Sequence, residues 1–521
     1  MEAMDAMTVR GKIRDYRLHV RWHSARNAAG WHDQRRAQKV FSIQFSALAF
    51  RFVGYRPLRY LPLLCILALA GCQSYHPMPL TQARVNEALK VPVWKQLRLS
   101  AQRIGGIGLP PLPLRPTGGI TPNEAAVIAV ILNPSLQVAR DQRGEAAAQV
   151  LQAGILPNPQ VSESTAFVTG GYRTGTFTGY GLGVNWDTTQ LIDHDARVAS
   201  AKYHRGQVDL EVAWREWQTA QAARLAVYNL AATEAELQQA RLAEHELQTN
   251  ERVVQKAFHA NLNTILDLSA ARAARQQAQA LVQSLMQNRD QNRLRLRLIM
   301  GLPIDAPIRL SRRIRFPRRI VLPPEQAILK DLPRLRLDLV ALKLGYKSQE
   351  ESLRAAVLRQ FPRLTLGFQQ ASDTTNVHTT GFGVSIDLPI FDRNQGNIAI
   401  QKATRKMLYD TYIAREFDAR SAVAMAYSDI HALTAQIGAT QAAVKSLAKL
   451  VQTYQQALKF GNVDIVSYYT EVDQLIAKRI NLIRLKNQLE RNRIALALAA
   501  GTYVPEMRPL QQPLQHGENT P

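Results

Sequence analysis

Two stretches of the chain change from a strand-like to a helix-like pattern of apolar and polar positions. In the later one, apolar residues take every other position from 382 to 388, and a helical pattern follows from about residue 396. Alternation with a period of two indicates a strand with one apolar face. A second alternating run at residues 364–368 precedes it, with turn-forming residues between the two. We therefore predict a β-hairpin over about residues 363–388.

The same arrangement occurs earlier in the chain, which indicates an internal duplication. An ungapped comparison at a spacing of 200 residues predicts a first hairpin at about 160–187. Residues 133–159 also align with 336–362, at a spacing of 203. The pairs shared at the spacing of 200 are Gly181/Gly381, Gly183/Gly383, Val184/Val384, Asp187/Asp387, Ala199/Ala399 and Lys202/Lys402.

A long helical tract without proline follows each hairpin, at residues 196–259 and 396–459. Asn261 and Gly461 are placed to reverse the chain after these tracts, because Asn and Gly tolerate the left-handed conformation that ends a helix. Return helices then run to about residues 300 and 500, where Gly301 and Gly501 end them. One seam of the second tract has the 4-3-3-4 spacing of a coiled coil: Val423, Tyr427, Ile430, Leu433 and Ile437.

A helix is also expected before each hairpin. In the first copy it begins with Thr121 as N-cap, Pro122 at the first position and Glu124 three residues after the cap, and it continues to about residue 155. The predicted divisions are a leader at 1–71, an extended arm at 72–122, a first repeat at 123–301, a linker at 302–332, a second repeat at 333–501 and a flexible tail at 502–521.

The leader holds the features of a signal peptide: Arg51, Arg56 and Arg59, then about ten apolar residues, then Leu-Ala-Gly-Cys ending at Cys72. This ending resembles the lipobox of bacterial lipoproteins, which implies that Cys72 carries a lipid anchor. The alternative is an unmodified thiol beside an ordinary cleavage site. Residues 1–50 lie before a leader that is complete without them, so we expect translation to begin near Val53.

Composition argues against several other classes of protein. The net charge is +24, but residues 1–71 hold 12 Lys/Arg against 4 Asp/Glu, and the remaining +16 is spread along helices rather than gathered in one basic patch. A nucleic-acid role is therefore not expected. The only two cysteines, Cys65 and Cys72, form no disulfide framework or redox motif.

No enzyme motif is present. The chain has no GxSxG, HExxH or P-loop pattern, and Gly381-x-Gly383 lacks the third glycine of a nucleotide loop. The histidines lack ligand spacing, so we expect no catalytic residue, no metal site and no cofactor; those weighed are His194, His204, His259, His378 and His431.

The duplicated order of helix, hairpin, long helix and return helix behind a lipobox resembles the TolC-like outer-membrane efflux family. The motifs that carry the likeness are Leu-Pro-Asn-Pro at 156–159, Leu-Pro-Ile-Phe-Asp-Arg-Asn-Gln-Gly at 388–396, and residues 461–464. The first copy departs from this pattern at Thr188-Thr-Gln190 and at Asn261. The sequence Ala-Gly-Ile-Leu-Pro-Asn-Pro, which ends at Pro159, is similar to sequences of the heavy-metal efflux branch.

The resemblance implies a fold that is mainly α, with a small transmembrane β-barrel contribution. Spanning structure needs a closed barrel, and four strands cannot enclose a channel. A homotrimer would supply 12 strands, continued by an α-helical coiled-coil tunnel into the periplasm. The expected function is an outer-membrane channel of a tripartite efflux system, embedded in outer-membrane lipid, that exports small solutes such as metal ions or drugs.

The resemblance also implies partners and sites. A periplasmic adaptor, or membrane fusion protein, would meet the helix reversals at Asn261, Leu262, Gly461 and Asn462, and an inner-membrane pump of the proton-driven class would feed the channel. Asp464 would contribute to an acidic pore ring, with Asp267 and Asp473 behind it. Each acid could instead satisfy backbone donors at a helix N-terminus. The alternatives are an exit duct for type I polypeptide secretion and a periplasmic adaptor protein.

Overall fold

A computed structural model describes residues 74–90, 97, 118–171, 174–312, 314, 316, 322–460 and 463–501. Its contacts divide the chain into two units, residues 1–91 and 92–521. The predicted leader, Cys72, Gly461, Asn462 and the predicted tail at 502–521 lie outside the described residues.

In the described residues of the first unit, α3 (Gln82–Ala88) is a short helix, where the sequence predicted an extended arm. Thr81 is its N-cap, and the Thr81 hydroxyl accepts a hydrogen bond from the backbone N–H of Arg84. Within the predicted arm at 72–122, these residues are therefore helical, and Thr81 satisfies one of the free N–H groups at the start of the helix.

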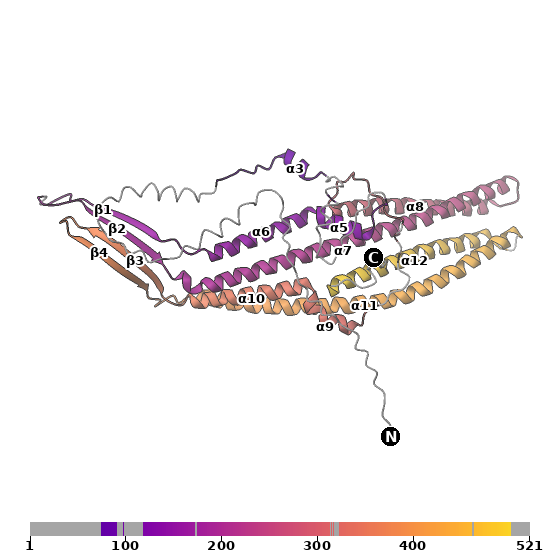
Figure 1. The fold of residues 1–521 in the computed structure, drawn as a ribbon. Coiled ribbons are helices and arrows are strands. Elements are labelled where there is room, and N and C mark those ends of the chain that lie inside the picture. Colours follow the sequence, from indigo (N-terminus) through magenta and orange to yellow (C-terminus); the bar gives the residue numbers. More distant parts are fainter. Residues whose placement is uncertain are drawn as a thin grey trace, which may run out of the picture. The chain divides into compact units, whose positions relative to one another are not determined.

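The second unit contains the two repeats, each with two short helices, a hairpin and two long helices (Figure 1). This confirms a mainly helical, duplicated chain. The first repeat comprises α5 (Pro122–Leu132), α6 (Pro134–Gly154), β1 (Gln160–Ala166), β2 (Gly179–Asp187), α7 (Gln190–His259) and α8 (Ile265–Met300). The second comprises α9 (Glu325–Leu335), α10 (Leu337–Leu358), β3 (Arg363–Ser372), β4 (His378–Asp387), α11 (Gln395–Lys459) and α12 (Ile465–Ala500).

The two hairpins join into one antiparallel sheet of order β1-β2-β3-β4, which lies at one end of α7 and α11 (Figure 1). Strand β2 of the first repeat pairs with β3 of the second over Tyr180↔Ser372 to Asp187↔Thr365. The duplication therefore produces one continuous sheet per chain, with β1 and β4 as its two outer strands.

The long helices pack against their neighbours through three apolar clusters. Near their middle, α5 and the end of α8 pack on α7 around Leu230, Leu296 and Met300. The second repeat repeats this with α9, α11 and the end of α12, where the predicted seam from Val423 to Leu433 is buried. Toward the helix reversals, α12 joins α7 and α8 around Tyr468 and Ile480. This last cluster holds the two helical pairs together.

Two details of the helices before the hairpins differ from the sequence prediction. The single helix expected to run from 122 to 155 is broken at Asn133, which is extended (φ −62°, ψ 117°) because it precedes Pro134. Its amide group donates to the carbonyl of Ile299. In the second repeat, α9 begins at Glu325, inside the expected linker 302–332. The second break lies at Arg336, whose guanidinium donates to the carbonyl of Ala499, as Asn133 donates to Ile299 in the first repeat.

The return helices stop where they meet these breaks, which explains the predicted glycine stops. Gly301 and Gly501 are both left-handed (φ 69° and 67°). A Cβ on Gly301 would lie 2.4 Å from the carbonyl oxygen of Leu132, and one on Gly501 would lie 2.7 Å from Cα of Arg336. In the first repeat α6 and the return helix α8 thus stack end to end beside α7. In the second repeat α10 and α12 stack in the same way beside α11.

Gly301→Ala should lower the thermal unfolding midpoint of the detergent-solubilised protein. A left-handed alanine costs about 1–2 kcal/mol, and the backbone contact with Leu132 adds to that cost. Gly144→Ala, in the exposed interior of α6 with open space around it, is the matched control and should stabilise by about 1 kcal/mol. Equal effects of the two substitutions would contradict the stacking described here.

Candidate functional site

One face of the sheet is apolar in the part next to the helices, and the described residues of the chain do not cover it. Residues directly opposite in the register share a face, so Val161, Val184, Phe368 and Phe382 form one row across all four strands. Trp186, Leu366 and Val384 form the next row. Phe382 is 87% exposed and Val384 is 64% exposed. An uncovered apolar band of this kind is a surface that water solvates poorly.

The opposite face carries small or polar side chains at the same level of the sheet. Gly183, Gly367 and Gly383 are paired in register with one another or with polar neighbours. The other residues of this face include Ser162, Ser164, Asn185, Thr365, Gln369 and Ser385. One face therefore suits lipid, and the other suits an aqueous interior.

The two junctions between a strand and a long helix differ in a way that the position of each strand explains. After β2, the hydroxyl of Thr188 donates to the carbonyl of Leu364, and the hydroxyl of Thr189 accepts from the N–H of Leu364. The departure of the first copy from the Leu-Pro-Ile motif thus places two hydroxyls against the backbone of the adjacent strand β3. This role was not predicted from the sequence.

The equivalent junction after β4 contacts no strand on its outer side. Leu388 is 71% exposed, Ile390 is 65% exposed and Phe391 is 91% exposed. Three large apolar side chains on one short turn are costly to leave in water. Their exposure leaves an apolar surface on this side of the sheet.

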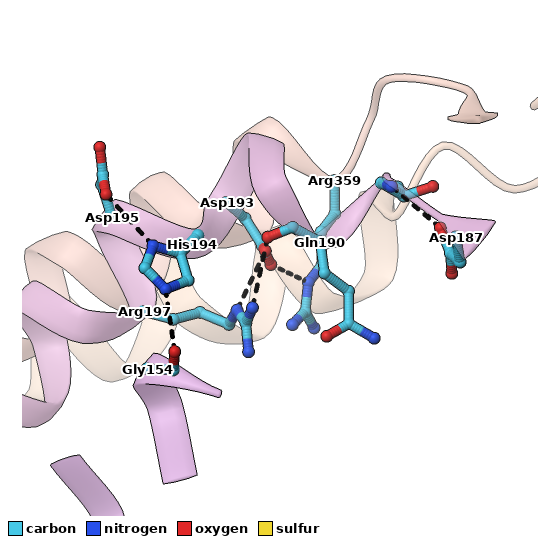
Figure 2. A network of polar contacts seen from close by, with 9 residues as sticks. Gly154, Asp187, Gln190, Asp193, His194, Asp195, Arg197 and Arg359 are labelled. Carbon is cyan, nitrogen blue, oxygen red and sulfur yellow. Dashed lines mark hydrogen bonds and ion pairs between the residues drawn. The ribbon is translucent and has the colours of Figure 1, made fainter. Parts of the chain in front are cut away.

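A charged network anchors the start of α7 against α10 (Figure 2). Asp193 is buried, with 3% of its side chain exposed. Its carboxylate accepts hydrogen bonds from Nε of Arg197 at 3.0 Å and from Nε of Arg359 at 2.6 Å. In Figure 2 both guanidinium groups converge on this one carboxylate. His194 beside it lies 3.3 Å from the carbonyl of Gly154. The network links the two repeats below the sheet, and the sequence analysis missed it.

At the first helix reversal, the predicted residue Asn261 adopts the left-handed conformation (φ 58°) and ends α7. Leu262 is 79% exposed, and its N–H donates to the carbonyl of Ala257. Asp267 completes a capping box, since its carboxylate accepts from the N–H of Thr264. The exposed apolar side chains around both reversals are Leu262, Ile265, Leu266, Phe460 and Val466.

At the second reversal, Asp464 is the N-cap of α12 and accepts from the N–H of Ser467 at 3.1 Å. Asp464 is exposed, as is Asp473, which accepts from the amide group of Gln277 in α8. The structure thus gives Asp464 and Asp267 helix-capping contacts. It does not bring the three acids into one cluster within a single chain, and the described residues contain no group of three His, Cys, Asp or Glu suited to a metal ion.

Polar contacts also join α7 to α12 along an antiparallel seam. The Arg484 guanidinium donates to Glu236 at 3.1 Å, and Asn487 donates to Asn229 at 2.9 Å. Burial raises the pKa of Glu236, although the charge and hydrogen bond of Arg484 act in the opposite direction. Burial also raises the pKa of Tyr469 to about 12.

Removing the shared carboxylate should loosen the junction between the repeats. Asp193→Asn is expected to lower the free energy of unfolding by about 2 kcal/mol, because two charge-assisted hydrogen bonds are weakened in a buried place. The control is Asp410→Asn, which breaks an exposed pair with Lys406 and should cost less than about 0.5 kcal/mol. Denaturant unfolding in detergent measures both variants, and equal losses would show that Asp193 is not an anchor.

Comparison with known proteins gives one family and one fold. Residues 329–502, the second repeat, match the family described as Outer membrane efflux protein. No curated protein matches the sequence. Among the described residues, no helix is both long enough and apolar enough to cross a membrane.

Solved structures with the same fold include outer-membrane channels. The CusC structure has a TM-score of 0.64 at 20% identity, covering 74% of this chain and 94% of CusC. VceC of Vibrio cholerae has a TM-score of 0.63 at 18% identity, covering 73% of this chain and 96% of VceC. MtrE of Neisseria gonorrhoeae has a TM-score of 0.57 at 17% identity, covering 73% of this chain and 88% of MtrE. The second repeat thus matches the outer membrane efflux protein family, and the chain as a whole has the fold of these outer-membrane channels.

Proposed function

We propose that this protein is the outer-membrane channel of a tripartite efflux system and works as a homotrimer. The observation that carries the proposal is the sheet, which has an uncovered apolar face, a small and polar opposite face, and two outer strands. In a bilayer every backbone N–H and C=O needs a protein partner, so the outer edges of β1 and β4 must pair. Pairing β4 of one chain with β1 of the next closes the sheet.

The strand number supports three copies. A closed sheet of 12 strands lies within the range of outer-membrane barrels. Strands β2, β3 and β4 have nine or ten residues, which suits a tilted strand crossing the hydrocarbon layer. The exposed turn at Leu388, Ile390 and Phe391 would then be covered by the neighbouring chain, at the place where Thr188 and Thr189 meet Leu364 within one chain.

The helices would continue the barrel as a tunnel. At ~1.5 Å per residue, the 70 residues of α7 reach roughly 105 Å into the periplasm. Cys72, if lipidated, would add an acyl anchor in the outer membrane. The reversals at Asn261, Leu262, Gly461 and Asn462 would meet the periplasmic adaptor, which a proton-driven inner-membrane pump would load.

The exposed apolar side chains at the reversals, Leu262, Ile265, Leu266, Phe460 and Val466, support contact with a partner there, because the described part of the chain does not cover them. No observation favours polypeptide secretion over the export of small solutes, metal ions or drugs. A continuous four-stranded sheet from two repeated hairpins argues against a periplasmic adaptor. The channel has no need of catalysis, so we expect no enzymatic activity.

The orientation of the sheet can be tested with two adjacent residues on opposite faces. Val384→Arg should abolish recovery of the protein in the outer-membrane fraction, because an arginine facing lipid at mid-depth costs about 2–4 kcal/mol in each chain. Ser385→Arg should leave recovery and trimer formation intact, since it faces the aqueous interior. Equal recovery of the two variants would contradict the proposed membrane face. Discrete single-channel conductance steps from Val384→Arg but not from the wild type would contradict it as well.

The acidic ring can be separated from helix capping at Asp464. Asn is as good an N-cap as Asp but carries no charge. We expect Asp464→Asn and Asp464→Ala to change single-channel conductance or its block by divalent cations alike, with only the alanine variant losing about 1 kcal/mol of stability. Conductance traces in planar bilayers that are unchanged by the Asn substitution would limit Asp464 to its capping role. Asp267→Asn and Asp473→Asn test the acids behind it.

A further inference from the structure

A polar groove lies between the two repeats at the level where the long helices begin. It has a volume of about 400 Å³ and receives side chains from α6, α7, α10 and α11. The hydroxyl of Ser200 in α7 lies 3.0 Å from that of Ser348 and 2.8 Å from that of Ser352 in α10, and the Ser348 hydroxyl donates to the carbonyl of Ser200. The groove is thus lined by hydroxyl, amide and guanidinium groups together with the methyl groups of Ala201, Ala355 and Ala356.

The side chains that line the groove include cations but no carboxylate. Arg197 and Arg359 enter from α7 and from the end of α10, and His204 lies on the same face of α7. Both arginines are bound to Asp193, so one negative charge is shared between two positive charges. The groove therefore retains an excess of positive charge, which attracts an anion.

The guanidinium groups keep donors for a further acceptor. Each of them meets Asp193 through Nε, as Figure 2 shows. The terminal nitrogens point away from this bond by the planar geometry of the group, and one of them on Arg197 lies 3.3 Å from the carbonyl of Gln190. Arg359 is half-exposed, so its remaining N–H groups are accessible to a ligand.

Neutral donors complete the lining on the side of α11. Asn397 accepts from the amide group of Gln401 at 3.2 Å through its Oδ1, which directs its own NH₂ group elsewhere. Asn397, Gln401 and Gln149 lie around the groove together with the serines. A tetrahedral oxyanion accepts hydrogen bonds from donors in several directions, which matches such a lining.

We propose that this groove binds a phosphate group through Arg197, Arg359 and the neighbouring hydroxyl and amide donors. The source we favour is the headgroup phosphate of an anionic phospholipid, since the groove lies where the sheet gives way to the helices. This choice of source rests on the proposed membrane function, because that level then coincides with the periplasmic headgroup layer. The phosphate site itself needs only the groove.

Two probes separate the sources. Native mass spectrometry of the full-length protein in detergent measures retention of phosphatidylglycerol, with phosphatidylcholine as the neutral reference, and calorimetric titration measures inorganic phosphate. We expect bound phosphatidylglycerol that added phosphate displaces. Binding of inorganic phosphate without any preference for phosphatidylglycerol would support the site and reject the lipid as its source. Binding of neither probe would overturn the proposal.

Two variants test the residues. Arg359→Gln should weaken binding of the anion about tenfold or more, as expected for the loss of a charge-assisted hydrogen bond. Asn397→Asp adds a carboxylate of the same shape to the groove and leaves both ion pairs of Asp193 in place. If this variant loses binding as much as Arg359→Gln does, the loss is not caused by a folding defect at Asp193. Arg354→Gln removes an exposed arginine of α10, paired only with Glu351, and should bind like the wild type.

Unchanged binding in both Arg359→Gln and Asn397→Asp would overturn the assignment of the groove. The titration with inorganic phosphate involves no membrane, so a failure of the groove and a failure of the channel proposal give different results. If Val384→Arg and Ser385→Arg were recovered equally in the outer membrane, the channel proposal would fail, but the protein could still bind phosphate. Conversely, a working channel could fail to bind phosphate.

Discussion

Unpaired backbone groups at the two outer strands are the constraint on which the interpretation of this molecule depends. The described residues form a sheet of four strands with no second layer, and they leave the apolar row through Val184 and Phe382 uncovered. In water such an arrangement exposes both apolar surface and strand edges. In lipid the apolar surface is favourable, but the edges are not tolerated, so the sheet has to be completed by further copies.

The helical part of the chain solves a different problem, which is to keep two very long helices rigid over their whole length. Each is supported by a short helix and a return helix that meet end to end, at Asn133 in the first repeat and at Arg336 in the second. The left-handed glycines Gly301 and Gly501 allow the close approach at these meeting points. The same solution appears twice because the whole unit is duplicated.

Much of this organisation was predictable because it rests on local patterns. Alternation predicts the strands, the absence of proline predicts the long helices, and Asn261 and Gly301 mark helix ends through their backbone preferences. The break at Asn133 had a local signal as well, since Pro134 follows it, but the break at Arg336 is followed by Leu337 and depends on packing against α12. The contact of Asp193 with Arg359 joins residues 166 positions apart, and no local pattern predicts such a partner. The capping roles of Asp267 and Asp464 were foreseen only as an alternative to the pore ring.

The most direct test of this account is the mass of the protein complex after extraction of the outer membrane with detergent, measured by light scattering with the detergent contribution subtracted. The account predicts a particle of three chains that is insoluble without detergent. A water-soluble monomer would contradict it, because a single chain would then leave the apolar face and both strand edges of its sheet without partners.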